Sequence, residues 1–273
     1  MIFADAHVHP ADWLAVSGAA EMPAEYRMFC ACAAAAEEFA CGENLRRKAA
    51  AEPGGRDVRL AFGVHPQLPA VLARQGVPAA EIPSALDESL ALLETLAAGK
   101  KLDALGETGL DAFTPDFAAT LSMQERLMDA QFALAARYGL PVVLHLRRAS
   151  ALLFQRVRVL RNLPAVVFHG WSGTAGEALS LLRRGVNAWF SFGKVLLRGS
   201  RKAVGSLCAL PAERLLFETD APYMTLRGEA FSSPQDIARV YAAAAGLLEI
   251  PPEKLAETAA ANFRAAFGVT APG

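Results

Sequence analysis

The chain opens with Ile2-Phe3-Ala4-Asp5-Ala6-His7-Val8-His9-Pro10, an apolar run that ends in two histidines one residue apart. The run predicts a short buried β-strand, and on a strand residues i and i+2 share one face. His7 and His9 can therefore aim both imidazoles at one point, as half of a metal site requires. Taken alone, a His-x-His pair is more often a pair of turn or core histidines than a metal site.

The other three histidines shift this balance. His65, His145 and His169 each lie at the C-terminal end of an apolar run, as His7 and His9 do. Surface histidines would instead be scattered over helices and loops. The shared position favours a common role for all five imidazoles.

The composition is that of a globular enzyme. With 273 residues and 53% hydrophobic content, the chain can bury one sizeable core, and we expect a single domain over residues 1–273. No basic-then-apolar leader opens it, and no apolar run approaches the roughly 18–20 residues that a bilayer span needs. We expect a cytoplasmic enzyme with no membrane association and no obligate protein partner. The four cysteines lack C-x-x-C spacing, so we expect reduced, mostly buried thiols.

The net charge of −1 argues against general affinity for nucleic acid, but the charge is unevenly distributed. Between residues 130 and 212, twelve Lys and Arg residues accompany a single acidic residue, Glu177. Several of these bases fall on predicted helices, where a solvated outer face is the better interpretation. The bases that follow predicted strands are Arg147, Arg148, Lys194 and Arg198.

Eight apolar, β-rich runs alternate with helical stretches rich in alanine, leucine and charge. Most runs are continuously apolar, which is typical of strands covered on both faces. Eight alternations of strand and helix predict an α/β fold of the (β/α)8 TIM-barrel type. A doubly wound open sheet is the alternative, but no Gly-x-Gly-x-x-Gly follows the first strand. The predicted strands are residues 2–6, 28–33, 58–63, 102–106, 141–146, 165–168, 187–192 and 214–217.

The helical stretches are less regular. They are predicted at residues 33–50, 84–98, 118–138 and 149–161, with two more helices in residues 233–268 on either side of Pro251-Pro252. Residues 67–83, which contain several prolines, are expected to form an exposed excursion after the third strand.

Candidate catalytic residues follow the predicted strands one after another. In a barrel of this type the C-terminal ends of all strands face one mouth, so these side chains should meet there. Four imidazoles and two carboxylates are enough to hold two divalent cations, with one carboxylate bridging them. The candidates are His7, His9, His65, Glu107, His145, His169 and Asp220.

Motifs around these residues resemble the TatD family of metal-dependent hydrolases. They are Asp5-Ala6-His7-Val8-His9, Gly63-Val64-His65-Pro66, Gly106-Glu107-Thr108-Gly109-Leu110-Asp111, His145-Leu146-Arg147, His169-Gly170-Trp171-Ser172-Gly173 and Glu218-Thr219-Asp220-Ala221-Pro222. The resemblance implies a barrel of the amidohydrolase superfamily with metal-dependent deoxyribonuclease (DNase) activity. Residues 258–267 look like the family's closing helix. Arg148 and Trp171 depart from the family's frequent residues, which affects substrate preference and leaves the metal site intact.

The resemblance also implies a role for each candidate. One cation would be held by His7, His9 and Asp220. The second would be held by His145 and His169, and Glu107 would bridge the two. Asp220 would also orient the attacking water or take its proton, because two bound cations acidify water. His65 would contact the substrate phosphate. Asp5 and Glu218 would orient imidazoles or water from behind the ligands.

Three further residues are predicted to bind substrate. Arg147 and Lys194 follow strands near where barrels often bind phosphate, which arginine clamps and lysine attracts as a point charge. For Lys194 an ordinary solvated charge is equally expected. Trp171 could stack on a base or pack against the barrel rim. Zn²⁺, Mn²⁺ and Mg²⁺ are all possible, although four histidines argue against a pure Mg²⁺ site.

The preferred function is a two-metal phosphodiesterase that acts on nucleic acid, at single-stranded or frayed DNA ends. One alternative is another ester or C–N hydrolase, such as an aminoacyl-tRNA ester hydrolase. Many C–N hydrolases of the superfamily carry a carboxylated lysine at the fourth strand, and no lysine adjoins Glu107. The other alternative is a non-catalytic barrel, which would be expected to have lost ligands.

Overall fold

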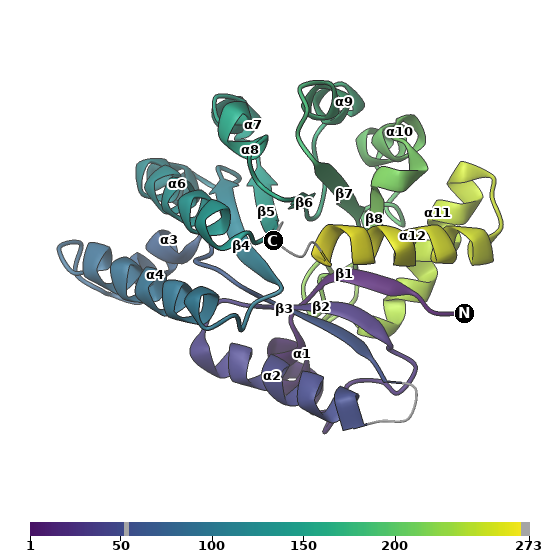
Figure 1. The fold of residues 1–273 in the computed structure, drawn as a ribbon, viewed down its shortest axis with the longest axis horizontal. Helices are drawn as coiled ribbons and strands as arrows, with labels where there is room; N and C mark the ends of the chain where they lie inside the picture. The colour runs from purple at the N-terminus through teal and green to yellow at the C-terminus, as the bar shows by residue number, and fades with distance from the viewer. Residues whose placement is uncertain (52–54, 269–273) are drawn as a thin grey trace.

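The computed structural model describes residues 1–51 and 55–268. Eight parallel strands form one sheet, and their order in space is their order in the chain. Figure 1 shows the helices arranged around these strands. This is the predicted (β/α)8 barrel, and the doubly wound alternative is wrong because no strand leaves the chain order. The strands are β1 (Ala4–Val8), β2 (Met28–Ala33), β3 (Asp57–Phe62), β4 (Ala104–Asp111), β5 (Val142–Arg147), β6 (Val166–Phe168), β7 (Ala188–Phe192) and β8 (Leu215–Phe217).

The two ends of the sheet meet just beyond β8. The backbone N–H of Asp220 donates to the carbonyl of His7, and the N–H of His9 donates to the carbonyl of Ala221, each at 2.9 Å. These bonds join the end of β1 to the segment that follows β8. The barrel is therefore nearly closed at the mouth where the predicted ligands lie.

The helices differ from prediction mainly where they break. Residues 149–161 form two short helices, because the backbone at Arg156 leaves the helical region (φ −102°, ψ 10°) and its N–H bonds to the carbonyl of Leu153. The excursion at residues 67–83 contains a short helix, α3. The helices are α1 (Pro10–Ser17), α2 (Ala36–Ala51), α3 (Leu68–Arg74), α4 (Ile82–Ala98), α5 (Pro115–Ala119), α6 (Leu121–Tyr138), α7 (Ser150–Phe154), α8 (Val157–Leu160), α9 (Ala175–Arg183), α10 (Arg201–Ala209), α11 (Ile237–Leu248) and α12 (Pro252–Phe267).

The last helix closes one end of the barrel. Ala260, Phe263 and Phe267 of α12 belong to the same buried cluster as small strand residues such as Ala4 and Ala61. Small side chains leave room in a barrel interior, and the two phenylalanine rings help to fill it. Helix α12 contacts β1 and β8, which lie beside it in Figure 1. Helix α12 thus covers the two strands at which the barrel closes.

The four cysteines are free thiols, as predicted, although only Cys30 and Cys32 are buried. Within residues 1–51 and 55–268, the helices are too short or too polar to cross a membrane.

Candidate metal centre

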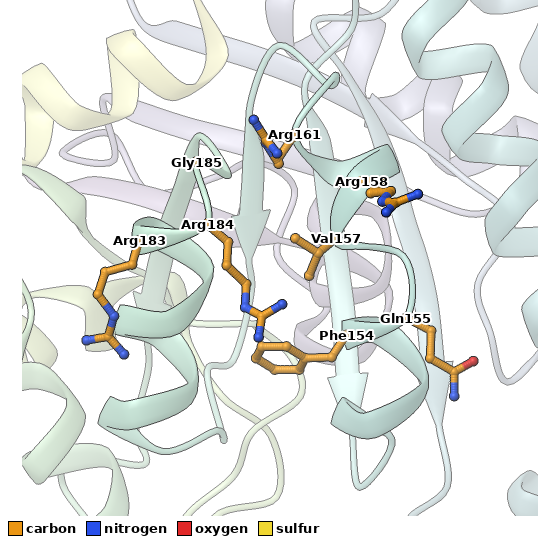
Figure 2. Close-up of a pocket in the computed structure, with 8 residues that line it drawn as sticks. All are labelled: Phe154, Gln155, Val157, Arg158, Arg161, Arg183, Arg184 and Gly185. Carbon is orange, nitrogen blue, oxygen red and sulfur yellow. The ribbon is translucent and has the colours of Figure 1, made fainter.

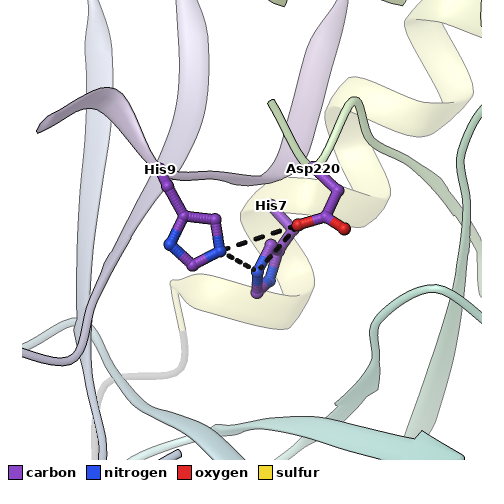
Figure 3. Close-up of side chains that lie close together, drawn as sticks. All are labelled: His7, His9 and Asp220. Atoms are coloured by element: carbon purple, nitrogen blue, oxygen red, sulfur yellow. Dashed lines mark hydrogen bonds and ion pairs between the residues drawn. The ribbon is translucent and has the colours of Figure 1, made fainter. Parts of the chain in front are cut away.

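Three predicted ligands converge where β1 and β8 end. Nε2 of His7 and Nε2 of His9 are 3.0 Å apart, and Oδ1 of Asp220 lies 3.7 Å and 3.6 Å from them. Figure 3 shows the carboxylate between the two imidazoles and the segment after β8. Asp220 has φ 52°, a region uncommon for residues other than glycine, and its bond to the carbonyl of His7 holds it there. The barrel closure therefore positions this carboxylate.

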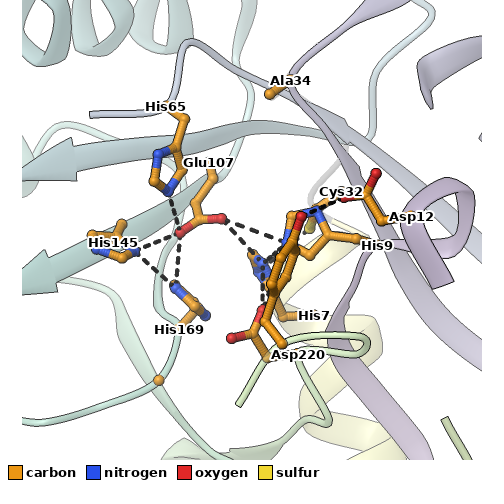
Figure 4. Close-up of polar contacts among 12 residues, drawn as sticks. His7, His9, Asp12, Cys32, Ala34, His65, Glu107, His145, His169 and Asp220 are labelled. Carbon is orange, nitrogen blue, oxygen red and sulfur yellow. Dashed lines mark hydrogen bonds and ion pairs between the residues drawn. The ribbon is translucent and has the colours of Figure 1, made fainter. Parts of the chain in front are cut away.

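Glu107 connects this group to a second one. Its Oε2 lies 3.2 Å from Nε2 of His7 and 3.8 Å from Nε2 of His9. Its Oε1 lies 2.6 Å from Nδ1 of His145 and 2.9 Å from Nε2 of His169. Figure 4 shows the carboxylate between the two imidazole pairs. Glu107 lies within β4, which continues to Asp111, and not at the strand end expected from the sequence.

His65 approaches the same carboxylate from β3. Its Nε2 lies 3.2 Å from Oε1 of Glu107, and its side chain is 23% exposed, more than those of the other four histidines. The N–H of Gln67 donates to Nδ1 of His65 at 3.2 Å, which fixes the ring. With Nδ1 accepting that hydrogen bond, the neutral ring carries its hydrogen on Nε2, which faces Glu107 and is accessible to a substrate.

The surrounding imidazoles stabilise an ionised Glu107. Burial raises the pKa of its carboxyl, but His169, His65 and His7 together hold that pKa well below its ordinary value. For His7, burial and the neighbouring His169 lower the pKa of the imidazole. Burial lowers the pKa values of His9, His145 and His169, but the neighbouring carboxylates raise them above the ordinary value, so a bound cation would displace protons from these rings.

These donors fit divalent cations on geometric grounds. Ring nitrogens that face each other at 3.0 Å and 3.2 Å, in His7–His9 and His145–His169, repel unless a proton or a cation lies between them. Imidazole nitrogens and carboxylate oxygens are ligands of Zn²⁺ and Mn²⁺. The side chains predicted from the sequence do come together, in overlapping groups on either side of Glu107.

The site opens into a cavity of about 660 Å³. Arg147 lines it with a side chain that is 40% exposed and stacks over the ring of Phe113 at 4.0 Å. Tyr223, half-exposed, also lines it, and its ring lies edge-on to that of His9 at 5.1 Å. The cavity mouth therefore places the Arg147 guanidinium and the accessible Tyr223 ring beside the buried candidate metal ligands.

The sequence profile of the family described as TatD related DNase matches residues 4–268. The chain belongs to the TatD family of metal-dependent hydrolases. It is 31% identical over 230 residues to the uncharacterized metal-dependent hydrolase YjjV of Escherichia coli, a match that covers 83% of each protein. It is 41% identical over 146 residues to the 3'-5' ssDNA/RNA exonuclease TatD of Edwardsiella piscicida, which is 52% of this chain and 54% of that protein.

Solved structures of TatD proteins have the same architecture. The crystal structure of Escherichia coli YjjV aligns with a TM-score of 0.75 at 29% identity and covers 99% of this chain and 100% of that one. A TatD family hydrolase from Entamoeba histolytica aligns with a TM-score of 0.72 at 18% identity over 99% of this chain and 100% of that one. The second likeness concerns the fold alone.

In this TatD family member, polar groups stand behind three of the imidazoles. Oδ2 of Asp111 lies 3.0 Å from Nε2 of His145, and Sγ of Cys32 lies 3.4 Å from Nδ1 of His7. Oε1 of Glu218 lies 3.4 Å from Nδ1 of His169 and accepts a hydrogen bond from the N–H of Gly170 at 2.6 Å, and its orienting role stays a prediction. Such outer partners fix the orientation and tautomer of a ligand ring.

Asp5 binds hydroxyl groups and backbone N–H groups, and not an imidazole ring. It accepts hydrogen bonds from Tyr26 Oη at 2.5 Å, Thr219 Oγ1 at 2.6 Å and the N–H of His7 at 3.1 Å. Burial raises the pKa of its carboxyl to about 7, although these hydrogen bonds lower it. Asp5 thus ties the strand that carries His7 to the segment that carries Asp220.

One predicted substrate contact, Lys194, lies away from the metal-centre cavity. Lys194 has no exposed surface, and its Nζ donates to Glu229, to Ser232 at 3.0 Å and to Asp236 at 2.8 Å. It is neither a solvated charge nor free for phosphate, because the segment after β8 supplies its partners. We therefore withdraw Lys194 from the substrate contacts.

Trp171 lies at the cavity but its ring is buried. Only 2% of the residue is exposed, and the ring packs edge-on against Phe168 and Phe190, with centroids 5.4 Å and 4.9 Å away. The structure favours the alternative expectation, packing against the barrel rim, over base stacking.

The sequence interpretation gave no role to Asp111, which is buried behind His145, or to Tyr223, which lines the cavity. Asp111 follows Glu107 at a spacing of four residues in β4, and the strand period of two places both on one face. That period is a signal by which it could have been found. Tyr223 follows a predicted ligand by three residues, and nothing in its local sequence distinguishes it from a surface tyrosine.

Proposed function

We propose that this protein is a phosphodiesterase that removes nucleotides from single-stranded nucleic-acid ends and binds two divalent cations, Zn²⁺, Mn²⁺ or Mg²⁺, per chain. The observation that carries the proposal is the Glu107 carboxylate, one oxygen of which faces His7 while the other faces His145. A carboxylate shared in this way is typical of two-metal sites. We propose that all of residues 1–273 act as one catalytic unit.

Each cation would have its own ligand group on one side of Glu107. Divalent cations bound there would lower the pKa of a water molecule and neutralise charge on phosphoryl oxygens. We propose that the first cation is held by His7, His9 and Asp220. The second would be held by His145 and His169, and Glu107 would contact both cations.

Asp220 is the proposed proton acceptor. Burial raises the pKa of its carboxyl, but the hydrogen bond from His9 and the nearby imidazoles lower it below its ordinary value, so the carboxylate is ionised at neutral pH. It lines the cavity, where it can orient an attacking water and take its proton. His65, the most exposed of the histidines, is proposed to contact the phosphate under attack.

The cavity supports a single-stranded substrate. Its volume of about 660 Å³ suits a strand end of about two nucleotides, because ligand cavities of this size enclose small molecules and not a duplex. Arg147 is proposed to bind a phosphate next to the scissile one. Tyr223, unlike Trp171, has an exposed ring on which a base could stack.

The name of the Edwardsiella piscicida relative supports a nucleic-acid substrate, since it describes a 3'-5' exonuclease on ssDNA and RNA. It also supports cleavage at strand ends over cleavage within a strand. Nothing in the cavity specifically favours an aminoacyl ester or a C–N bond.

The decisive test is a panel of substrates and metals on one purified sample. DNA and RNA single strands, duplex DNA, charged tRNA and bis(p-nitrophenyl) phosphate would each be incubated with Mg²⁺, Mn²⁺ or Zn²⁺, and bound metal would be measured in parallel. We expect stepwise shortening of single strands and two ions per chain. Bound metal without hydrolysis of any phosphodiester would refute the proposal, and ester cleavage of charged tRNA alone would assign the other hydrolase class.

A further inference from the structure

A second cavity lies outside the barrel, on the wall formed by α7, α8 and the end of α9. Its volume is about 550 Å³, and it shares no lining residue with the metal-centre cavity. Figure 2 shows that its lining comes from two sides, residues 154–161 and residues 183–185. We call this cavity the outer arginine groove. Its lining residues are Phe154, Gln155, Val157, Arg158, Arg161, Arg183, Arg184 and Gly185.

Four arginines line this groove, and no acidic residue is among the lining. Within the described part of the chain the only polar side-chain contact recorded for the four arginines runs from Nε of Arg184 to Oγ of Ser180 at 3.3 Å. Arg156, on the same chain segment, is different, because it pairs with Glu125 at 2.7 Å and Asp129 at 2.8 Å. The positive charge of the groove is thus not neutralised by neighbouring carboxylates.

The groove lies in the basic part of the sequence. Residues 130–212 contain twelve Lys and Arg residues and one acidic residue, although the whole chain carries a net charge of −1. Like charges gathered around a concavity raise the local positive potential and concentrate anions there. Arginine also binds phosphate through two parallel hydrogen bonds, which makes it the preferred partner of phosphate groups.

We propose that the outer arginine groove binds phosphate groups of a nucleic-acid strand at a distance from the metal centre. Four arginine side chains carry more positive charge than a single phosphate group requires for binding, so the ligand carries several phosphate groups. The Phe154 ring adds an apolar surface for a base. That the ligand is a nucleic-acid strand rests on the proposed function. A free nucleotide offers the same phosphate chemistry and is the alternative ligand.

Chain connectivity links the two cavities. Arg147, at the end of β5, lines the metal-centre cavity, and α7 begins three residues later, at Ser150. Residues 150–161, which lead to the groove, span roughly 18 Å if taken as helical. At a phosphate spacing of about 3.4 Å this span corresponds to about five nucleotides, so a strand longer than that could occupy both cavities.

The test is binding of phosphorothioate oligothymidylates, which resist hydrolysis, by the metal-loaded protein. The variant Arg158→Gln/Arg183→Gln is compared with Arg47→Gln/Lys254→Gln, a control that removes two exposed charges on α2 and α12. Fluorescence anisotropy would give affinities for strands of 20 and three nucleotides between about 50 and 200 mM salt. All four substitutions are at exposed positions, so both variants should fold.

For the groove variant we expect roughly tenfold weaker binding of the 20-nucleotide strand. The slope of log affinity against log salt concentration should be smaller in magnitude by about 1.4, and the affinity for the trinucleotide should not change. The control should match the unmodified protein. The proposal would be overturned if both variants lost affinity equally, or if the groove variant lost as much affinity for the trinucleotide as for the long strand. Displacement of the long strand by ATP at equal phosphate concentration would assign the groove to free nucleotides instead. Binding needs no turnover, so a failure of hydrolysis with this pattern intact would count against the proposed function alone.

Discussion

Nε2 of His145 lies 3.0 Å from Oδ2 of Asp111, a carboxylate with no exposed surface. The other ring nitrogen, Nδ1, faces Glu107 at 2.6 Å. Burial raises the pKa of Asp111, but hydrogen bonds from His145 and Gln67 lower it to about 2. An ionised Asp111 keeps the hydrogen on Nε2 and leaves Nδ1 as the ligand atom, so it acts through His145 as a positioning residue.

Removal of that carboxylate should weaken metal binding without removing a proposed ligand. For Asp111→Ala we expect a loss of about 10–100-fold in affinity for the more weakly bound ion, because the His145 ring loses its fixed orientation. Isothermal titration calorimetry with Mn²⁺ would measure it. Asp111→Asn, whose amide oxygen can still accept the hydrogen bond, should recover part of the loss. Unchanged affinity in Asp111→Ala would remove this role.

Glu107 should be the one ligand whose loss affects both ions. In Glu107→Ala we expect metal content to fall toward zero, since the carboxylate faces both imidazole pairs. Asp220→Ala, which affects only the group with His7 and His9, should retain about one ion. Elemental analysis of the purified variants would give ions per chain. One ion retained in Glu107→Ala would contradict the shared ligand.

The proton acceptor can be separated from the fold by a conservative change. Asp220→Asn should lower kcat by about 10²–10⁴ and leave the far-ultraviolet circular dichroism unchanged, because the amide cannot take a proton but fits the same space. Asp12→Asn is the matched control, a second carboxylate that lines the cavity, bonded to Tyr223 Oη at 2.7 Å. Similar rates in the two variants would exclude Asp220 as the acceptor.

The sequence predicted those features that depend on local pattern. The eight strands and the predicted ligands could be inferred because apolar runs of strand length precede each ligand, and a parallel barrel brings strand ends together. The position of Glu107 within a strand was missed because β4 continues through Thr108, Gly109 and Leu110, where glycine normally favours a turn.

Features that depend on distant partners were not predictable. Lys194 follows a strand as a phosphate-binding lysine would, but its partners lie 35 to 42 residues later, on a segment whose path no local pattern predicts. Trp171 likewise looked equally suited to stacking and to packing, and only the neighbouring Phe168 and Phe190 decide between them.

The buried Lys194 should matter for stability and not for substrate binding. Lys194→Met keeps the length of the side chain but removes the buried cation from Asp236, which then pairs with Arg239 alone. We expect the free energy of unfolding to fall by about 2 kcal/mol, less than for a fully buried pair because Asp236 is partly exposed. KM for a single-stranded substrate should not change. A raised KM at normal stability would restore Lys194 as a substrate contact.

That destabilisation should itself depend on pH. The hydrogen bond from Lys194 lowers the pKa of Glu229 below its ordinary 4.5, and for Asp236 burial raises the pKa but the same lysine lowers it below 3.8. Groups with lowered folded pKa values stabilise the fold above their ordinary values and lose this effect as pH falls through the folded ones. Urea unfolding should therefore show the largest difference between wild type and Lys194→Met at neutral pH and a shrinking difference below about pH 4. Lys48→Met, which breaks an exposed pair with Glu21, is the control and should have nearly the stability of wild type at every pH. If the loss of stability in Lys194→Met did not depend on pH, lost packing and not lost charge would be its cause.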